Sequence, residues 1–448
     1  MTYIPNTDAN RKTILNAIGA SSVEELLTVI PKDIRLPRPL GLPPALSEME
    51  LADLLMDLSS QNLDNDHAVS FIGGGLYDHY IPSAIKHLAG RSEFLTSYTP
   101  YQPEVSQGTL QGIYEFQSMI CELTGMDVAN ASMYDGASAM AEAILMARTL
   151  TGRNRVVLVD TTHPQYIETA RTYAHGPGIH LDLLVCPEGV VDPVALKTMV
   201  TDQTACVVIQ HPNFFGNLEA VAAIEPITHA AGALLVVVVD PISVGLINPP
   251  GVYGADIAVG EGQSLGNQIS FGGPALGFFA TRQDYVRRMP GRIAGQTVDQ
   301  QGRRGFVLTL QAREQHIRRE KATSNICTSQ QLNALMATIY LAMTGKYGLR
   351  KIAELCLQKS HYAAERICSI PGYELAFKTP FFKEFVVRTP GNPTAIVHEL
   401  SKKGIHAGVS LRRFPALNLE DSLLIAVTER RTKEQIDRLA NALERLKH

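Results

Sequence analysis

Short apolar runs alternate with amphipathic segments between residues 71 and 320, and this alternation constrains the fold most strongly. The runs are rich in Val, Ile and Leu, as in strands that are covered on both faces. They are Arg155–Asp160, His180–Cys186, Thr204–Gln210, Ala233–Asp240, Ala255–Val259 and Ala275–Ala280. Segments with apolar residues at three- and four-residue spacing, such as Pro164–Ala174 and Ile224–Ala231, lie between them. This order predicts an α/β domain with a mainly parallel sheet.

The regions on either side of this alternation have a different character. Before it, three helical patterns are interrupted by a proline-rich link at residues 37–44, which favours an extended strap. After it, two long helical patterns precede a mixture of short strands and helices. We therefore expect an N-terminal helical arm over residues 1–70, a large α/β domain over 71–328 and a small C-terminal α/β domain over 329–448.

Composition excludes several kinds of protein. The chain has 448 residues and a net charge of −4, so we expect no nucleic-acid partner and no polybasic membrane surface. No apolar run approaches the ~20 residues that a membrane helix needs, and the polar N-terminus does not resemble a secretory signal. The six cysteines form no CxxC pair, which predicts reduced thiols and no metal site. A cytoplasmic enzyme fits this composition.

Polar residues follow several of the expected strands. Asp160 and His163 come after the first strand, Asn213 after the third and Asp240 after the fourth. Each of them alone could serve as a helix cap or a turn. Together they favour a shared pocket, because ligands of open α/β sheets bind at the carboxyl ends of the strands.

This set of residues suits a pyridine cofactor. A carboxylate such as Asp240 can keep a pyridinium nitrogen protonated, which makes the ring an electron sink. The N-terminus of a helix supplies amides for a phosphate group. Tyr134, Asp135 and Gly136 open the helical pattern that continues over Ser138–Leu150, and they are well placed for that task.

The lysine that such an enzyme needs is missing from its expected place. It should follow the strand after Asp240, where the sequence instead has Gln263 and Ser264. No lysine lies between Lys197 and Lys321, and Lys321 is the only lysine expected near the core. A Schiff base requires an amine nucleophile, which Gln and Ser cannot replace. The chain therefore has the scaffold of a cofactor enzyme without its nucleophile.

Two other segments are candidates for contact with a substrate or a partner. One is a polar, aromatic and proline-stiffened loop, which could also be a plain connecting loop. The other is a basic stretch at the expected join between domains, which could also be an interdomain ion-pair network. Their candidate residues are Tyr98, Thr99, Tyr101, Gln102 and Glu104 in the loop, and Arg318, Arg319 and Lys321 in the join.

Four stretches of sequence resemble the glycine decarboxylase family, the P-protein of the glycine cleavage system. They are Ser97–Ala143, Gly254–Gly266, Ser270–Ala280 and His316–Gln330, and the resemblance extends over essentially the whole chain. It implies the aspartate-aminotransferase type of fold, which is fold type I of the pyridoxal phosphate enzymes. The family has a long form of two homologous halves and a split form of two subunits. This chain resembles the N-terminal-half (alpha) subunit of the split form, and it departs from the catalytic lysine motif around Gln263.

The resemblance also implies an activity and partners. The complex acts as a glycine dehydrogenase (aminomethyl-transferring): glycine forms an aldimine with pyridoxal phosphate, CO2 leaves, and the aminomethyl group passes to the lipoyl arm of H protein. The cofactor is bound covalently by the homologous subunit 2 (beta) in an α2β2 complex, and none is expected on this chain alone.

Three interpretations remain open at this point. In the first, the Tyr98–Glu104 loop and the Arg318–Lys321 join support the partner's site, while the degenerate pocket around Asp240 binds no cofactor. In the second, the chain is a non-catalytic scaffold that only stabilises the partner. In the third, Lys197 or Lys321 reaches the pocket and makes the chain a self-sufficient enzyme.

Overall fold

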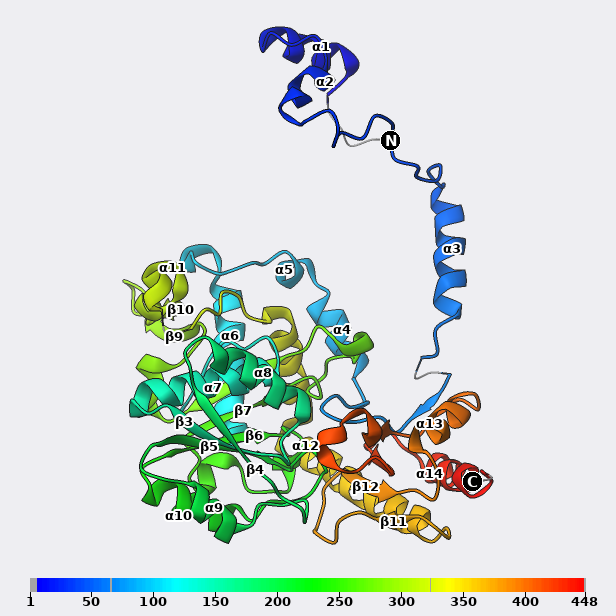
Figure 1. Cartoon of the computed structure of the whole chain (residues 1–448). Coiled ribbons are helices and arrows are strands. Elements are labelled where there is room, and N and C mark those ends of the chain that lie inside the picture. Colours follow the sequence, from blue (N-terminus) through cyan, green and yellow to red (C-terminus); the bar gives the residue numbers. More distant parts are fainter. Residues whose placement is uncertain (1–5, 65–66, 323, 447–448) are drawn as a thin grey trace. The chain divides into compact units, whose positions relative to one another are not determined.

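The computed structural model describes residues 6–64, 67–322 and 324–446, and the chain divides into two units, residues 1–63 and 64–448 (Figure 1). The first unit contains helices α1 (Asp8–Ala17), α2 (Val23–Leu26) and α3 (Glu48–Ser60). The side chains of Thr7, Ser22 and Ser47 accept backbone N–H groups at the starts of these helices. No helix or strand is found in the proline-rich link, as its sequence predicts.

The second unit is built on a seven-stranded sheet with the strand order β2-β8-β7-β6-β5-β3-β4. Strands β3 to β7 are mutually parallel, whereas β8 is antiparallel to both β7 and β2. The strands are β2 (Val128–Ala129), β3 (Arg155–Val159), β4 (His180–Leu184), β5 (Thr204–His211), β6 (Leu234–Val239), β7 (Ile257–Glu261) and β8 (Gly277–Thr281). The mainly parallel sheet predicted from the sequence is confirmed.

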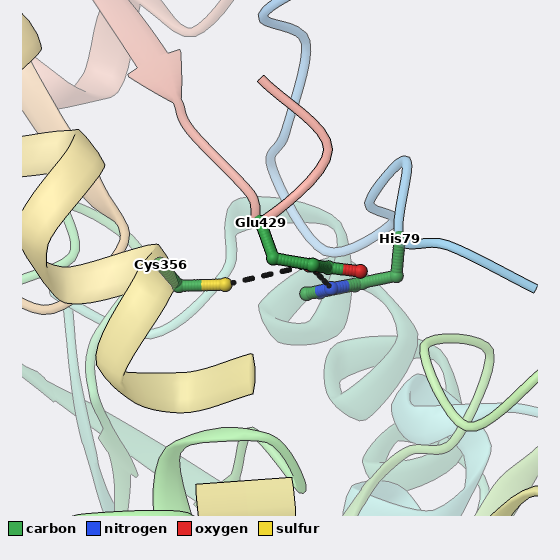
Figure 2. Close-up of side chains that lie close together, drawn as sticks. All are labelled: His79, Cys356 and Glu429. Carbon is green, nitrogen blue, oxygen red and sulfur yellow. Dashed lines mark hydrogen bonds and ion pairs between the residues drawn. The ribbon is translucent and has the colours of Figure 1, made fainter. Parts of the chain in front are cut away.

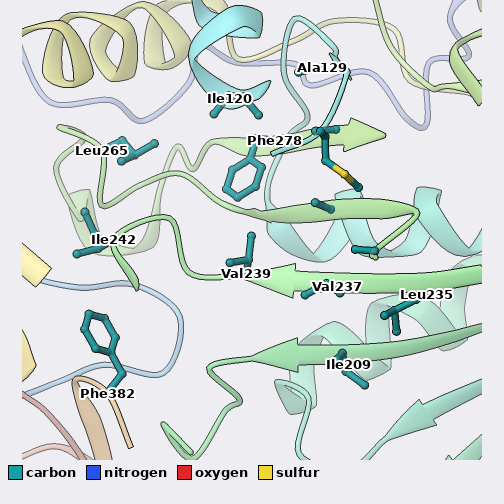
Figure 3. Packing of buried hydrophobic residues seen from close by; sticks show 14 of the residues in the cluster. Ile120, Ala129, Ile209, Leu235, Val237, Val239, Ile242, Leu265, Phe278 and Phe382 are labelled. Carbon is teal, nitrogen blue, oxygen red and sulfur yellow. The ribbon is translucent and has the colours of Figure 1, made fainter. Parts of the chain in front are cut away.

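Alternate residues of the central strands face two separate cores. Val157, Val207 and Val237 pack toward α6 and α12, while Val156, Val208 and Val236 pack toward α7 and α8. Figure 3 shows part of the first core, with Val237 and Val239 of β6 in the same cluster as Ile120 of α6. Both faces of the sheet are thus covered, which explains the continuous apolar runs. The covering helices are α6 (Gln107–Thr124), α7 (Gly136–Thr151), α8 (Pro164–His175), α9 (Pro193–Met199), α10 (Val221–Ala230) and α12 (Gln331–Cys368).

A smaller antiparallel sheet, with the order β11-β12-β15-β14, is formed by the C-terminal part of the chain. Its strands are β11 (Glu374–Leu375), β12 (Glu384–Arg388), β14 (Val409–Ser410) and β15 (Ser422–Ala426), and helices α13 (Pro393–Ser401) and α14 (Lys433–Glu444) accompany it. Helix α12 is interrupted at Gly345, whose φ of 55° accounts for the two helical patterns predicted there.

Most of the remaining helices and strands were not predicted from the sequence. Strand β1 (Val69–Ser70) pairs in parallel with β13 (Ile405–His406), and β9 (Ile293–Val298) forms a hairpin with β10 (Arg304–Thr309). Short helices α4 (Ser83–Ala89), α5 (Ser92–Leu95) and α11 (Gln315–Arg318) complete the unit. The domain boundary at residue 328 stays a prediction. Within the described residues, no helix is both long and apolar enough to cross a membrane.

Candidate functional site

Asp240, directly after β6, forms an ion pair with a lysine that lies far away in the sequence. Lys383, directly before β12, places its Nζ atom 2.6 Å from Oδ2 of Asp240. The exposed fraction is 2% for the Lys383 side chain and 13% for that of Asp240. The other carboxylate oxygen of Asp240 accepts the backbone N–H of Ile242 at 2.9 Å. Such a buried pair depends on both partners, because either charge alone would be costly in this position.

Tyr77 and Glu384 enclose the same ammonium group. The Nζ atom of Lys383 lies 3.6 Å from the centre of the Tyr77 ring, within the range of a cation–π interaction. The hydroxyl of Tyr77 donates to Oε2 of Glu384 at 2.5 Å, and the backbone N–H of Gly74 donates to Oε1 at 2.7 Å. Burial raises the pKa of Glu384 to about 7.

The glycine-rich stretch 73–75 is required for this close approach. A Cβ atom on Gly73 would lie 2.2 Å from Oε1 of Glu384, and Gly75 has a φ of +105°. A side chain at position 73 would clash with Glu384, and the backbone conformation at position 75 is one that only glycine adopts readily. The segment that carries Tyr77 can therefore pass directly over the end of the sheet.

His163 lies beside this segment, at the start of α8. Its Nε2 atom is 2.8 Å from the backbone oxygen of Gly74, its Nδ1 accepts the N–H of Gln165, and its ring stacks on that of Tyr166. Burial lowers the pKa of His163 to about 4, so the imidazole is neutral near pH 7.

The other two polar strand ends make local contacts. Oδ1 of Asp160 accepts the N–H of Cys186 at 3.0 Å. The amide of Asn213 donates to the carbonyl of Gly189 and to Glu219, at 2.8 and 2.7 Å. The structure thus brings Asp240 and His163 to the segment that contains Gly74, whereas these contacts of Asp160 and Asn213 stabilise turns.

The N-terminus of α7, where a phosphate was expected, is satisfied by carboxylates of this chain. Asp135 accepts the N–H of Ser138 at 2.7 Å as a helix cap, and Oε2 of Glu261 accepts the N–H of Gly136 at 3.0 Å. Oε1 of Glu261 also accepts the N–H groups of Gln263 and Leu276. Burial raises the pKa of Glu261 to about 7, although these three donors act in the opposite direction.

Tyr134, the residue before this helix cap, contacts the segment that precedes α12. Its hydroxyl accepts the backbone N–H of Cys327 at 3.1 Å, and its carbonyl accepts a bond from the side chain of Gln330 at 3.4 Å. These contacts attach the end of the predicted join to the start of α7.

The position expected for a Schiff-base lysine lies just past β7 and is buried. Ser264 is 4% exposed, and Gln263 accepts the N–H of Tyr77 at 2.9 Å and donates to the carbonyl of Asn267 at 2.7 Å. The buried lysine of this region is Lys383, whereas Lys321, the lysine expected near the core, is exposed. Because no amine is present at this position, the residues do not fit a covalently bound pyridoxal phosphate.

Figure 2 shows a cluster of His79, Cys356 and Glu429, and His79 in turn contacts Lys383 of the ion pair with Asp240. Their potential ligand atoms lie within 4.8 Å of one another, a spacing that could hold a metal ion. However, Nε2 of His79 lies 3.1 Å from Nζ of Lys383 and must accept a hydrogen bond from that ammonium group, which has only donors. The proton of the imidazole is then on Nδ1, which donates to Glu429 at 2.6 Å and cannot bind a metal. The cluster therefore extends the hydrogen-bond network of Lys383.

The Tyr98–Glu104 loop contacts the beginning of the predicted join. The hydroxyl of Tyr101 accepts a hydrogen bond from Arg292 at 3.0 Å, and its ring centre lies 5.7 Å from that of His316 in α11. Both Arg292 and His316 also lie near Glu314, at 3.5 and 3.6 Å. Tyr101 thereby connects the loop to α11, the helix that ends at Arg318, the first residue of the join.

The remaining candidates in these two segments mostly point to solvent. Tyr98 is 79% exposed, and of the candidate residues in the loop only Thr99 is half-buried. In the join, Arg318 donates to the carbonyl of Ala312, while Arg319 and Lys321 follow in a short 3-10 turn. The exposed candidates are Tyr98, Tyr101, Gln102, Glu104, Arg318, Arg319 and Lys321.

Sequence reasoning missed several residues that shape these sites, among them Lys383 and Arg292. Lys383 lies in the run Phe381–Val387, where two adjacent charges interrupt a series of aromatic and aliphatic residues; a charge within such a run was the available signal. Arg292 carried no comparable signal, since it follows a Pro-Gly turn in a region with no predicted element.

Known proteins are similar to this chain in both sequence and fold. Residues 1–443 match the family model for the glycine cleavage system P-protein. A protein of Carboxydothermus hydrogenoformans named probable glycine dehydrogenase (decarboxylating) subunit 1 is 54% identical over 99% of both chains. A protein of the same name from Chlorobium limicola is 54% identical over the full length of both. A crystal structure of glycine decarboxylase (P-protein) in inhibitor-bound form aligns with a TM-score of 0.90 and 44% identity over 99% of both chains.

The fold places the chain in fold type I of the pyridoxal phosphate enzymes, with a mostly parallel central sheet. More distant members share this fold alone, such as a NifS-like protein with a TM-score of 0.61 and 13% identity over 84% of this chain and 98% of that one. Within that class, the chain belongs to the P-protein family of the glycine cleavage system.

Proposed function

We propose that this chain is one half of a two-subunit glycine decarboxylase, the half that lacks the Schiff-base lysine. A homologous partner, subunit 2, carries the covalently bound pyridoxal phosphate, and the α2β2 complex releases CO2 from glycine and delivers the aminomethyl group to the lipoyl arm of H protein. One observation carries this proposal: Gln263 and Ser264 stand where the Schiff-base lysine would lie, in a chain that is 54% identical to proteins named subunit 1. The near-neutral composition supports a cytoplasmic complex.

In this proposal, the Tyr98–Glu104 loop and the Arg318–Lys321 join contribute to the partner's site. Their support is geometric, because Tyr101 ties the loop to Arg292 and to His316 of α11, the helix that ends at the first residue of the join. Tyr98 and Tyr101 are nevertheless 79% and 49% exposed. Large aromatic side chains that are held in place and remain exposed are typical of contact surfaces.

The test replaces each tyrosine by alanine in the complex formed with subunit 2. We expect Tyr98→Ala and Tyr101→Ala to lower glycine–bicarbonate exchange in the presence of H protein, while gel filtration shows an assembled complex. Tyr347→Ala is a matched control, since Tyr347 on α12 is also 79% exposed. Wild-type exchange rates in both loop variants would contradict the proposed role.

The second candidate function is a scaffold that only stabilises subunit 2. The exposed arm favours it, because α3 has no buried residue and presents apolar side chains such as Leu54, Leu55 and Met56. A scaffold predicts that the loop variants lose exchange only in proportion to lost complex. Loss of exchange in a fully assembled complex distinguishes the supporting role from the scaffold.

A further inference from the structure

We propose that Glu261 and Lys383 fill the two charged ends of the cofactor pocket in this chain and thereby exclude pyridoxal phosphate from it. The proposal extends the assignment of the cofactor to subunit 2, and it concerns only residues of this chain. It depends on three observations: the signs of the charges, the continuity of the contacts between them, and the anchoring of Lys383.

The charges match those of the cofactor at each end. A phosphate would accept N–H groups at the start of α7, and Glu261 places a carboxylate there, 3.0 Å from the N atom of Gly136. A pyridinium would offer a positive N–H to Asp240, and Lys383 places an ammonium there at 2.6 Å. Each end therefore already holds a group of this chain that makes the contact the cofactor would make: a carboxyl oxygen at the N–H of Gly136 and an ammonium at Asp240.

The two ends belong to one continuous body of side chains. Asp240 and Glu261 each lie two residues past the register pair Val238 and Val259 on the neighbouring strands β6 and β7. Glu261 accepts the N–H of Gln263, Gln263 accepts the N–H of Tyr77, and the Tyr77 ring lies under the ammonium of Lys383. A cofactor with its ring nitrogen at Asp240 and its phosphate at Gly136 would have to displace these contacts.

Lys383 is held in place by its own backbone and by its neighbours. Its carbonyl accepts the N–H of Val427 at 2.9 Å, and the adjacent Glu384 pairs with Ala426 at the beginning of β12. His79 accepts a further hydrogen bond from its Nζ atom. The Lys383 backbone is thus bound to Val427 while its ammonium is bound to Asp240 and His79, so that the anchored side chain acts as a plug.

The same geometry argues against Lys383 as a Schiff-base lysine. A charged ammonium that is paired with Asp240 is a poor nucleophile. It also lies at the end of the pocket that would hold the ring nitrogen, whereas the residues just past β7 are Gln263 and Ser264.

The first test uses the wild-type complex and requires no variant. After brief acetic anhydride treatment, mass spectrometry should find Lys383 unmodified, whereas Lys378, exposed and five residues earlier, should be acetylated. Borohydride reduction with excess pyridoxal phosphate should likewise leave Lys383 unlabelled. Acetylation of Lys383 in the native complex would contradict the proposal that Lys383 acts as a plug. A reduced pyridoxyl adduct on Lys383 would contradict it as well, because it would show that the pocket admits the cofactor.

The second test removes the plug in the complex and measures bound cofactor by equilibrium dialysis. We expect Lys383→Ala to bind additional pyridoxal phosphate, with up to one saturable equivalent more per chain than the wild type, while Lys378→Ala binds the wild-type amount. A Lys383→Ala complex that is assembled and folded by circular dichroism but binds no additional cofactor would overturn the proposal. These readouts concern only this chain, so they can fail while the loop variants still support the role at the partner's site, and the reverse.

Discussion

The buried pair of Asp240 and Lys383 offers the sharpest test of how the site is stabilised. Lys383→Met keeps much of the side-chain volume but removes the cation. The Asp240 carboxylate, which is only 13% exposed, then has no counterion. Breaking a buried pair in this way costs ~3–5 kcal/mol. The N–H of Ile242 still stabilises one oxygen of Asp240, so we expect the lower end of this range, ~3 kcal/mol.

The double variant Asp240→Asn/Lys383→Met shows whether the cost comes from the unpaired charge. Asparagine retains an oxygen that can accept the N–H of Ile242, and neither residue is then charged. We expect the double variant to recover ~1–3 kcal/mol relative to the sum of the single changes, since coupled neighbours deviate from additivity by about that amount.

The assay is urea unfolding of the purified full-length protein, followed by circular dichroism. Lys378→Met is the control, because Lys378 is exposed and such surface changes stay within about ±0.5 kcal/mol. A Lys383→Met protein that is as stable as this control would refute the reasoning, since the ion pair would then contribute nothing to the fold. Simple addition of the two single effects in the double variant would show that the residues act independently.

Three further predictions follow from buried groups and close contacts. The pKa of Glu384 is raised from an unfolded value of ~4.3 to about 7. Its contribution to the free energy of unfolding is therefore present at low pH and is lost as the pH rises through 7. In urea titrations, Glu384→Gln should make the decline in the free energy of unfolding between pH 5 and pH 8 smaller by ~3 kcal/mol. Gly73→Ala would place Cβ 2.2 Å from Glu384 and should lower the free energy of unfolding by ~1–3 kcal/mol, whereas Gly176→Ala, with nothing within 4 Å, should not. Native protein should react with Ellman's reagent first at Cys327, which is exposed, because burial raises the pKa of the Cys121 thiol to about 11 and also that of Cys206; a fast phase that persists in Cys327→Ser would contradict this.

The sequence predicted the sheet well because each central strand is covered on both faces. Residues such as Val156 and Val157 pack into opposite cores, so the strand must be apolar throughout and is visible as a run. The hairpin of β9 and β10 escaped prediction because its residues 296–298 are exposed and carry no such run. Hydrophobic pattern thus reports the depth of burial, and a hairpin with an exposed half such as β9 and β10 falls below what it can detect.

The site was predictable to the extent that its residues lie at strand ends. Asp240 follows the most apolar strand and was identified for that reason, as was the position of Gln263 past β7. The partner of Asp240 was not identifiable, because the contact depends on how the smaller sheet meets the larger one. Local pattern contains no information on such long-range pairing, even where an adjacent Lys-Glu pair in the Phe381–Val387 run indicates that something charged is buried.

Loss of the Schiff-base lysine alone would leave the rest of the pocket unsatisfied. Asp240 would be a buried carboxylate without a cation, and the N–H of Gly136 would lack an acceptor at the positive end of a helix. Lys383 and Glu261 supply those two charges from within the chain, at 2.6 and 3.0 Å. Under the proposed assignment of the cofactor to subunit 2, this chain can keep the aspartate and the helix N-terminus typical of its fold, because its own side chains satisfy both. Covalent binding of the cofactor would require a lysine past β7 as well as the removal of this plug.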